Sequence, residues 1–205
     1  MTDTVSVVLP KPVRSPGALA WRRFLRNPVA VIGSIVLTLI VFATVISTLI
    51  PALDPTAIDL TAVRKPPGPG HVLGTDSTGR DVFARLLSGG QVSLMVGFLS
   101  AAIAVCVGAL AGTVAGWFGG AWDAVISRIV DIMLSVPPVL VVMVVAGILG
   151  PSVPMLIGVI AGLSWPSSAR IARGVVLSLK EQEFIQAARV SGSSNGFIMF
   201  RPLLP

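Results

Sequence analysis

The sequence predicts an all-α polytopic membrane protein. Of its 205 residues, 54% are hydrophobic and only 12% are charged, whereas soluble domains carry roughly a quarter charged residues. The mean hydropathy is +0.90. Four apolar stretches approach or exceed the ~20 residues that a helix needs to cross a bilayer. The single cysteine excludes both a disulfide framework and a cysteine-rich metal site.

The four predicted spans differ in how clearly they are bounded. Residues 28–50 carry no charge and would extend about 33 Å as a helix. This apolar run is too long for a cleaved signal peptide, so it predicts a membrane anchor. Residues 92–118 form a second uncharged stretch. A third runs from about residue 124 to 149. A fourth runs from about residue 153 to 168 and extends into "ARIARGVVLSL" (169–179).

The basic residues predict the orientation of the spans. Eleven of the fifteen Lys and Arg residues lie in the 1–27 tail, at the start of the third span, or after residue 168. The other four lie in the 51–91 loop, where four aspartates balance them. Because Lys and Arg collect on the cytoplasmic side, we expect a cytoplasmic N-terminus and an extracytoplasmic 51–91 loop. This distribution favours a topological role for the charge over nucleic-acid binding.

The two segments that flank the first span have distinct patterns. The 1–27 tail ends in a basic amphipathic stretch with Trp21, which is typical of an interfacial helix at the membrane surface. A flexible basic tail that only sets topology is the alternative. In the 51–91 loop, a residue of the Asp76–Thr78 stretch is expected to cap a short helix, in which Asp81 and Arg85 pair at i, i+4. The only histidine, His71, argues against a metal site there.

Within the spans, three patterns predict packing. Gly108, Gly112 and Gly116 recur every fourth residue, a spacing that lets helices approach closely in lipid. Pro137 and Pro138 are expected to bend or unwind the third span. Near its start, Asp131 lies one turn from Arg128, and a structural ion pair between the two is favoured over a proton or substrate site.

Motifs for catalysis are absent from the sequence. There is no G-x-x-x-x-G-K-[ST] nucleotide loop. The only histidine, His71, lies in the 51–91 loop, so the sequence permits neither an H-E-x-x-H zinc motif nor a Ser-His or Cys-His dyad within the membrane. We therefore expect this chain not to be an enzyme and to carry no cofactor or metal.

Three segments, in order, resemble the permease subunits of ATP-binding-cassette (ABC) importers of the dipeptide, oligopeptide and nickel permease family. They are "HVLGTDSTGRDVFARLLSGGQVSL" (71–94), "SRIVDIMLSVPPVL" (127–140) and "WPSSARIARGVVLSLKEQEFIQAARVSGSSN" (165–195). The resemblance implies the transmembrane domain of a type I ABC importer, with four visible spans of an expected six. It also implies that 92–205 is a partial permease domain, and that the sequence is a fragment or a truncated form.

The resemblance assigns residues 178–205 to a cytoplasmic loop that couples the permease to an ATPase subunit. The implied coupling residues are Glu183, Phe184, Gln186, Ala187, Ala188, Gly192, Leu204 and Pro205. Alanines on one side of this helix would let a partner approach, while Phe184 and Ile185 would anchor the other side, and Gly192 would end the helix. Two positions depart from the family pattern: Gln186 replaces a glutamate, and Pro202 stands where related peptide permeases usually have histidine.

The resemblance also implies partners and a pathway. The partners are a homologous second permease subunit, two ATP-binding ATPase subunits and an extracytoplasmic solute-binding protein, assembled in the bacterial inner membrane. Candidate residues of the translocation pathway are Ser135, Pro137, Met143 and Trp165. Di- or oligopeptides are the expected substrates, nickel or another small solute is the alternative, and a membrane scaffold without transport activity is the alternative of another class.

Overall fold

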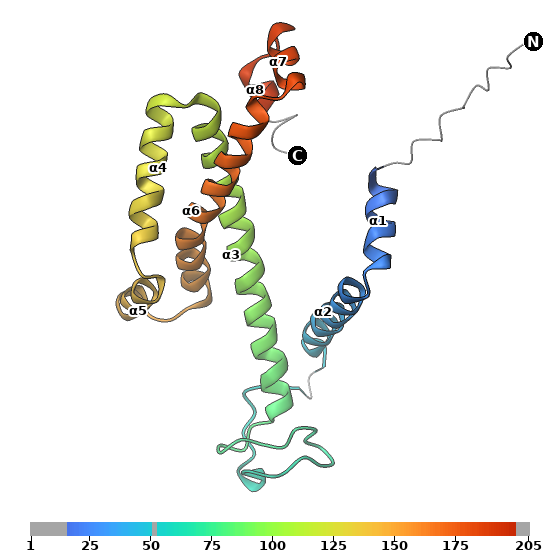
Figure 1. Cartoon of the computed structure of the whole chain (residues 1–205). Coiled ribbons are helices and arrows are strands. Elements are labelled where there is room, and N and C mark those ends of the chain that lie inside the picture. Colours follow the sequence, from blue (N-terminus) through green and yellow to red (C-terminus); the bar gives the residue numbers. More distant parts are fainter. Residues whose placement is uncertain (1–15, 51–52, 200–205) are drawn as a thin grey trace, which may run out of the picture. The chain divides into compact units, whose positions relative to one another are not determined.

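The computed structural model describes residues 16–50 and 53–199, which form helices joined by turns and one long loop (Figure 1). Within these residues there are no β-strands, only two isolated bridges in the loop. The all-α prediction is therefore confirmed. The chain divides into two units, Met1–Gln91 and Val92–Pro205, and helix α3 runs through the boundary between them.

The first unit begins with two consecutive helices, α1 (Pro16–Arg26) and α2 (Pro28–Ser47). Asn27 separates them, because its side chain accepts hydrogen bonds from the Val29 and Ala30 amides and so caps α2. In α1, the rings of Trp21 and Phe24 stack with centroids 5.6 Å apart. The expected helix in the tail is thus confirmed. The apolar stretch 28–50 forms a helix as predicted, although the helix ends at Ser47 instead of residue 50.

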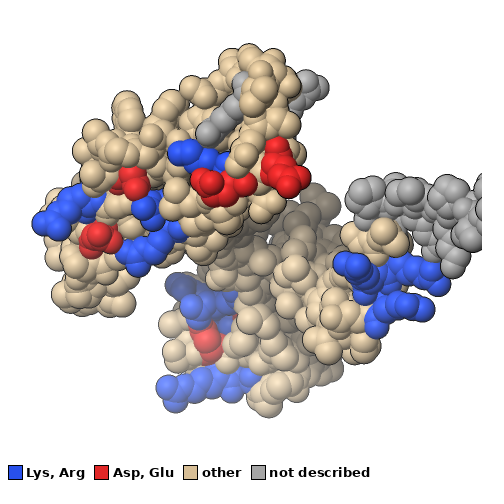
Figure 2. Space-filling model, turned by 45° about the horizontal axis from the view of Figure 1, so that its top comes forward, with Lys and Arg blue, Asp and Glu red and all other residues tan. Residues whose placement is uncertain are grey.

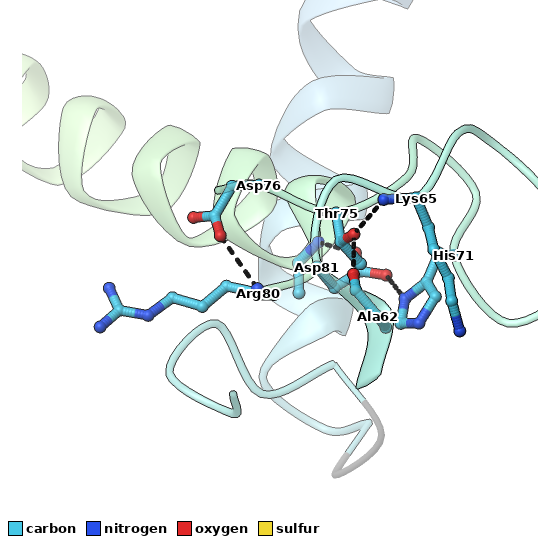
Figure 3. Close-up of polar contacts among 8 residues, drawn as sticks. Ala62, Lys65, His71, Thr75, Asp76, Arg80 and Asp81 are labelled. Atoms are coloured by element: carbon cyan, nitrogen blue, oxygen red, sulfur yellow. Dashed lines mark hydrogen bonds and ion pairs between the residues drawn. The ribbon is translucent and has the colours of Figure 1, made fainter. Parts of the chain in front are cut away.

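The loop that follows is folded, as predicted, and contains one short 3₁₀ helix, η1 (Leu60–Ala62). Thr75 makes two of the hydrogen bonds that hold this loop together. Its hydroxyl donates to the Ala62 carbonyl and accepts from the Lys65 amide at 2.9 Å (Figure 3). His71 Nδ1 lies 2.9 Å from a carboxylate oxygen of Asp81, just before α3. These bonds tie two distant parts of the loop to the start of α3.

The polar pairs predicted for this loop are wrong in detail. Asp81 itself caps α3, since its carboxylate accepts from the Ala84 amide at 2.9 Å. Because Asp81 faces those amides and His71, it does not pair with Arg85. Arg85 instead bonds to the carboxylate of Asp76, which also accepts from the Arg80 amide at 3.0 Å. Asp76 therefore closes a turn beside the helix instead of capping it.

Helix α3 (Val82–Phe118) is 37 residues long, or about 55 Å. It begins ten residues before the predicted second span, because residues 82–91 include Arg85, Gly89 and Gln91, which lower the hydropathy without breaking the helix. Gly90, in the third turn of α3, lies close to α2: a Cβ placed on it would lie 2.9 Å from the Thr44 methyl group. The short helix and the second span are thus one element.

The third predicted span is broken, as its prolines indicate. Helices α4 (Gly120–Ser135) and α5 (Pro138–Leu149) meet at an angle of 80°. Helix α6 (Val153–Lys180) covers the fourth span and continues through the predicted extension over residues 169–179. Among the residues that the structure describes, three helices are long and apolar enough to cross a membrane, and the bent pair would make a fourth span. Helices α7 (Glu183–Val190) and α8 (Asn195–Ile198) complete the second unit.

The glycine row of α3 packs directly on α6. Close packing at this row was predicted, whereas its partner helix was not. A Cβ on Gly108 would lie 2.8 Å from the Ala169 amide nitrogen, and one on Gly112 would lie 2.8 Å from the Ala172 Cβ. Gly116 similarly faces Val176 at 2.9 Å. The two backbones can approach this closely only because the α3 positions carry no side chain.

Candidate functional site

The 183–199 segment is held against the ends of α3 and α6 by a small apolar core. This anchor cluster consists of buried side chains from four elements: Trp117, Val176, Ile185, Ile198 and Met199. Ile185 and Ile198 are fully buried, with 0% of their surface exposed. Burying such side chains contributes roughly 1.5–3 kcal/mol each. The anchor cluster therefore fixes α7 and α8 to the long helices.

A hydrogen bond reinforces this junction. Lys180, in the last turn of α6, donates from Nζ to the carbonyl oxygen of Trp117 at 2.9 Å. Trp117 lies in the last turn of α3, where carbonyl groups lack partners inside their own helix and the helix dipole favours a cation. The ends of α3 and α6 are thereby joined by both apolar and polar contacts.

Helix α7 ends in the conformation that the sequence predicts. Gly192 has φ +78°, and the Ser193 amide bonds back to the Ala188 carbonyl at 3.1 Å. This is the Schellman arrangement, in which the residue after the helix takes a left-handed conformation. Ser194 then caps α8 by accepting from the Phe197 amide at 3.3 Å.

The two sides of α7 differ from the predicted assignment. Ile185 anchors the helix and Ala188 packs partly against the same cluster, whereas Phe184 is 51% exposed and Ala187 is exposed. The prediction that Phe184 is an anchor and that both alanines share the free side is wrong. At about 100° per residue, positions 185 and 188 share one face of a helix, and positions 184 and 187 share another.

The remaining predicted coupling residues fall into two groups. Glu183 and Gln186 are exposed beside Phe184 and Ala187, so these four form the exposed face of α7. The Gln186 side chain donates to the Glu181 carbonyl at 3.2 Å. Leu204 and Pro205 lie outside the described residues.

Two ion pairs join α4 to α6, and neither was predicted. Arg173 contacts both carboxylate oxygens of Asp123, at 2.5 and 2.7 Å. Arg170 contacts Asp131 at 2.7 Å. The predicted Arg128–Asp131 pair is therefore wrong, because Arg170 on the facing helix reaches Asp131.

The sequence does hold a signal for these pairs. Asp123, Ser127 and Asp131 recur every fourth residue, and Arg170 and Arg173 are three apart, so each set lies on one helix face. Nothing in the sequence says that the two faces meet. A cavity of about 360 Å³ is lined by Ser127, Asp131, Arg170 and Arg173, together with apolar residues of α4 and small residues of α3 and α6. Figure 2 shows basic and acidic side chains intermixed over part of the surface, whereas a basic patch near the N-terminal segment has no acidic neighbour in that view.

The four pathway candidates lie on three elements. Ser135 ends α4, where its hydroxyl donates to the Ile132 carbonyl at 2.7 Å, and Pro137 stands at the break. Met143 is 65% exposed on α5, and Trp165 is partly buried on α6. Among the contacts of the described residues, no hydrogen bond joins any two of them. Within residues 16–50 and 53–199, no three His, Cys, Asp or Glu side chains are grouped as a metal site would require.

Two family models match the chain. Residues 104–205 match the binding-protein-dependent transport system inner membrane component, and residues 15–67 match the N-terminal transmembrane domain of oligopeptide transport permease C. The first match includes α4 to α8 and the junction between α3, α6 and α7. The second includes α1, α2 and part of the folded loop.

Individual relatives agree with these matches. The glutathione transport system permease of Pectobacterium atrosepticum is 37% identical over 206 residues, which cover 100% of this chain and 68% of the relative. The dipeptide transport system permease of Haemophilus influenzae is 32% identical, over 100% of this chain and 70% of the relative. The dipeptide transport system permease of Alkalihalophilus pseudofirmus is 36% identical, over 93% of this chain and 63% of the relative.

The chain belongs to the permeases of ABC importers, which carry the type I importer membrane domain. Within that class it belongs to the dipeptide and oligopeptide permease family. It is a multi-pass membrane protein. It spans 63% of the length of Brucella relatives that are 39% to 40% identical to it and named as peptide permeases.

Proposed function

We propose that this chain is a permease subunit of an ATP-driven, binding-protein-dependent importer and forms part of its pathway for di- or oligopeptides. One observation carries the proposal: α7 exposes Glu183, Phe184, Gln186 and Ala187 while Ile185 beneath them is fully buried at the junction of α3 and α6. A protein bound to that exposed face acts directly on the ends of two long helices. The names of the relatives support peptides as the substrate class.

In this proposal the exposed face of α7 binds one of two separate ATPase subunits, and ATP is hydrolysed there. The chain itself is not an enzyme and carries no cofactor. Closure of the ATPases displaces α7, and the anchor cluster passes the displacement to α3 and α6 as rigid elements. A homologous second permease completes the pathway, to which Ser135, Pro137, Met143 and Trp165 contribute.

The proposed assembly sits in the bacterial inner membrane, with the N-terminus in the cytoplasm and the folded loop outside. A solute-binding protein on that side delivers the substrate. Since the binding protein selects what is delivered, the substrate test needs the whole assembly.

The substrate test is uptake into proteoliposomes that hold the permease pair, the ATPases and the binding protein. We expect uptake of a labelled dipeptide or tripeptide that requires both ATP and the binding protein. Nickel and glutathione are offered in parallel. Uptake of nickel but not of peptide would contradict the proposed substrate class. Uptake that does not require ATP would contradict the proposal that the protein is part of an ATP-driven importer.

The docking face has its own test. Ala187→Arg places a long charged side chain on the exposed face of α7 and should prevent co-purification of the ATPase subunits. Ala20→Arg, at an exposed position of α1, is the matched control and should leave co-purification unchanged. Equal recovery of the ATPases with both variants would exclude this face as the docking surface.

A further inference from the structure

Arg173 makes the strongest polar contact between α4 and α6. Its Nε and Nη2 atoms contact the two carboxylate oxygens of Asp123, which also accepts from the Ser127 hydroxyl at 3.1 Å. The side chains are 37% and 25% exposed. A bidentate pair fixes the relative orientation of two groups as well as their distance. The Arg173–Asp123 pair therefore sets how α4 lies on α6.

The same stretch of α6 is the junction for the coupling segment. Val176 belongs to the anchor cluster and Lys180 bonds to Trp117. The backbone at Arg173 packs on the glycine row: a Cβ on Gly112 would lie 2.9 Å from its amide nitrogen. Residues 173–180 thus contact α3, α4 and α7 within about two turns of helix.

The chain connection between α3 and α4 constrains the position of α4 less than these contacts do. Gly119 alone separates α3 from α4, and Gly120 is the first residue of α4. The two have φ +65° and +52°, and a Cβ on either would meet nothing within 4 Å. Two glycines with open surroundings constrain direction poorly. The position of α4 must therefore be held by its contacts with the neighbouring helices, above all those with α6.

We propose that Arg173 and Asp123 are positioning residues that make α4 move together with α6 and the coupling segment. Displacement of α7 then reaches the 80° break between α4 and α5. This inference rests on the proposed function, because it concerns how ATP-driven motion reaches the pathway.

The second ion pair provides a matched control. Arg170 and Asp131 share a single contact at 2.7 Å, and each side chain is 60% exposed. Exposed single-contact pairs contribute little. The two pairs join the same two helices, so removing each in turn separates the special role of Arg173–Asp123 from a general effect of lost charge.

The first experiment uses the assembled transporter in proteoliposomes, with peptide uptake and substrate-stimulated ATPase activity measured on the same preparation. Asp123→Asn should lower uptake about five-fold or more while ATPase activity stays within about two-fold. Asp131→Asn should leave both within about two-fold. The exchange of Asp123→Arg together with Arg173→Asp should regain at least about half of the wild-type uptake.

The exchange keeps both charges, so it tests the contact even where a single variant fails to assemble. An exchanged complex that assembles but transports no better than Asp123→Asn would overturn the inference. So would wild-type uptake by Asp123→Asn. If the wild-type transporter itself takes up no peptide, the proposed function fails instead.

A covalent link tests whether the pair stays closed through the cycle. Cysteines replace Asp123 and Arg173 in a background with Cys106→Ser, and a short bismaleimide joins them in the assembled complex. We expect low uptake before cross-linking and recovery after it, because α4 and α6 are again held together. Retained ATPase activity with no recovery of uptake would show that the helices must separate, which overturns the inference.

Discussion

Gly192 ends α7 with φ +78°, and a Cβ at this position would meet nothing within 4 Å. Substitution therefore changes the backbone preference and leaves packing unchanged. Gly192→Val costs about 1–2 kcal/mol, because β-branched residues resist the left-handed conformation. We predict that the variant hydrolyses ATP but takes up less peptide, measured as the ratio of the two rates in proteoliposomes.

Gly196→Val is the matched control for that substitution. Gly196 lies within α8, has equally open surroundings and has no positive φ. It should keep a near-normal ratio of uptake to ATP hydrolysis. Equal loss in both variants would mean that bulk in this segment, and not the conformation of Gly192, matters.

Asp76 predicts how the folded loop responds to acid. The Thr78 hydroxyl first, then the Arg80 amide, hold the pKa of the Asp76 carboxyl well below its usual range. A depressed pKa in the folded state stabilises the loop above the ordinary aspartate pKa, and this contribution is lost as pH falls through the folded pKa. Amide exchange protection around Thr75 should therefore be constant between pH 7 and about 5 and fall below about pH 4.

Removing the charge should abolish much of that pH response. Asp76→Asn should lower protection around Thr75 at neutral pH and flatten the acid dependence. Asp54→Asn is the control. Among the side chains that the structure describes, only that of Thr56 donates a hydrogen bond to the Asp54 carboxylate. An unchanged acid profile for Asp76→Asn would exclude Asp76 as the responsible group.

At the scale of elements, the glycine row determines how closely α3 lies on α6. A Cβ on Gly112 would meet the Ala169 carbonyl oxygen and the Ala172 Cβ. Gly112→Val must push the helices apart, and overpacking of this kind costs about 1–3 kcal/mol. We predict a lower melting temperature in detergent. Gly97→Val, on the same helix with nothing within 4 Å of its Cβ, should melt close to wild type.

Much of the element order is readable from local sequence. The apolar runs, the glycine row and the prolines at the break act over a few residues, and each predicted the structure that forms. Element ends were less predictable, since Arg85, Gly89 and Gln91 lower the hydropathy of a segment that still continues α3. The predictions of polar pairs were wrong for a different reason. Arg128 lies nearest Asp131 along the chain, but only packing of α4 on α6 brings Arg170 to it.

The anchor cluster shows the same limit at the candidate site. Gly192 was predictable because a helix end needs a particular backbone conformation. Trp117 and Ile198 are 81 positions apart in sequence, and no periodicity links them. Which face of α7 is buried is decided by that distant contact, so Phe184 was assigned to the wrong side.

At the scale of the whole molecule, the distribution of basic residues predicts which side of the membrane each segment occupies. Ser77 is exposed in the folded loop, which we expect to be extracytoplasmic. Ser77→Cys, with Cys106→Ser, should react with a membrane-impermeant maleimide in spheroplasts. Labelling of this cysteine only after lysis would contradict the predicted topology. As a control for the opposite side, a cysteine at the exposed α4 position Ala121 should label only after lysis.

The 80° break also decides what must surround the middle of the third span. Pro137 and Pro138 have no amide hydrogen, so they cannot donate to the carbonyls of Met133 and Leu134 four residues earlier. The Val136 amide reaches the Met133 carbonyl at 3.4 Å, which leaves Leu134 without its helical donor. The hydrocarbon core of a bilayer offers no hydrogen-bond donor to this carbonyl. The break must therefore be hydrated or covered by protein, and α4 and α5 cannot both turn this edge toward lipid.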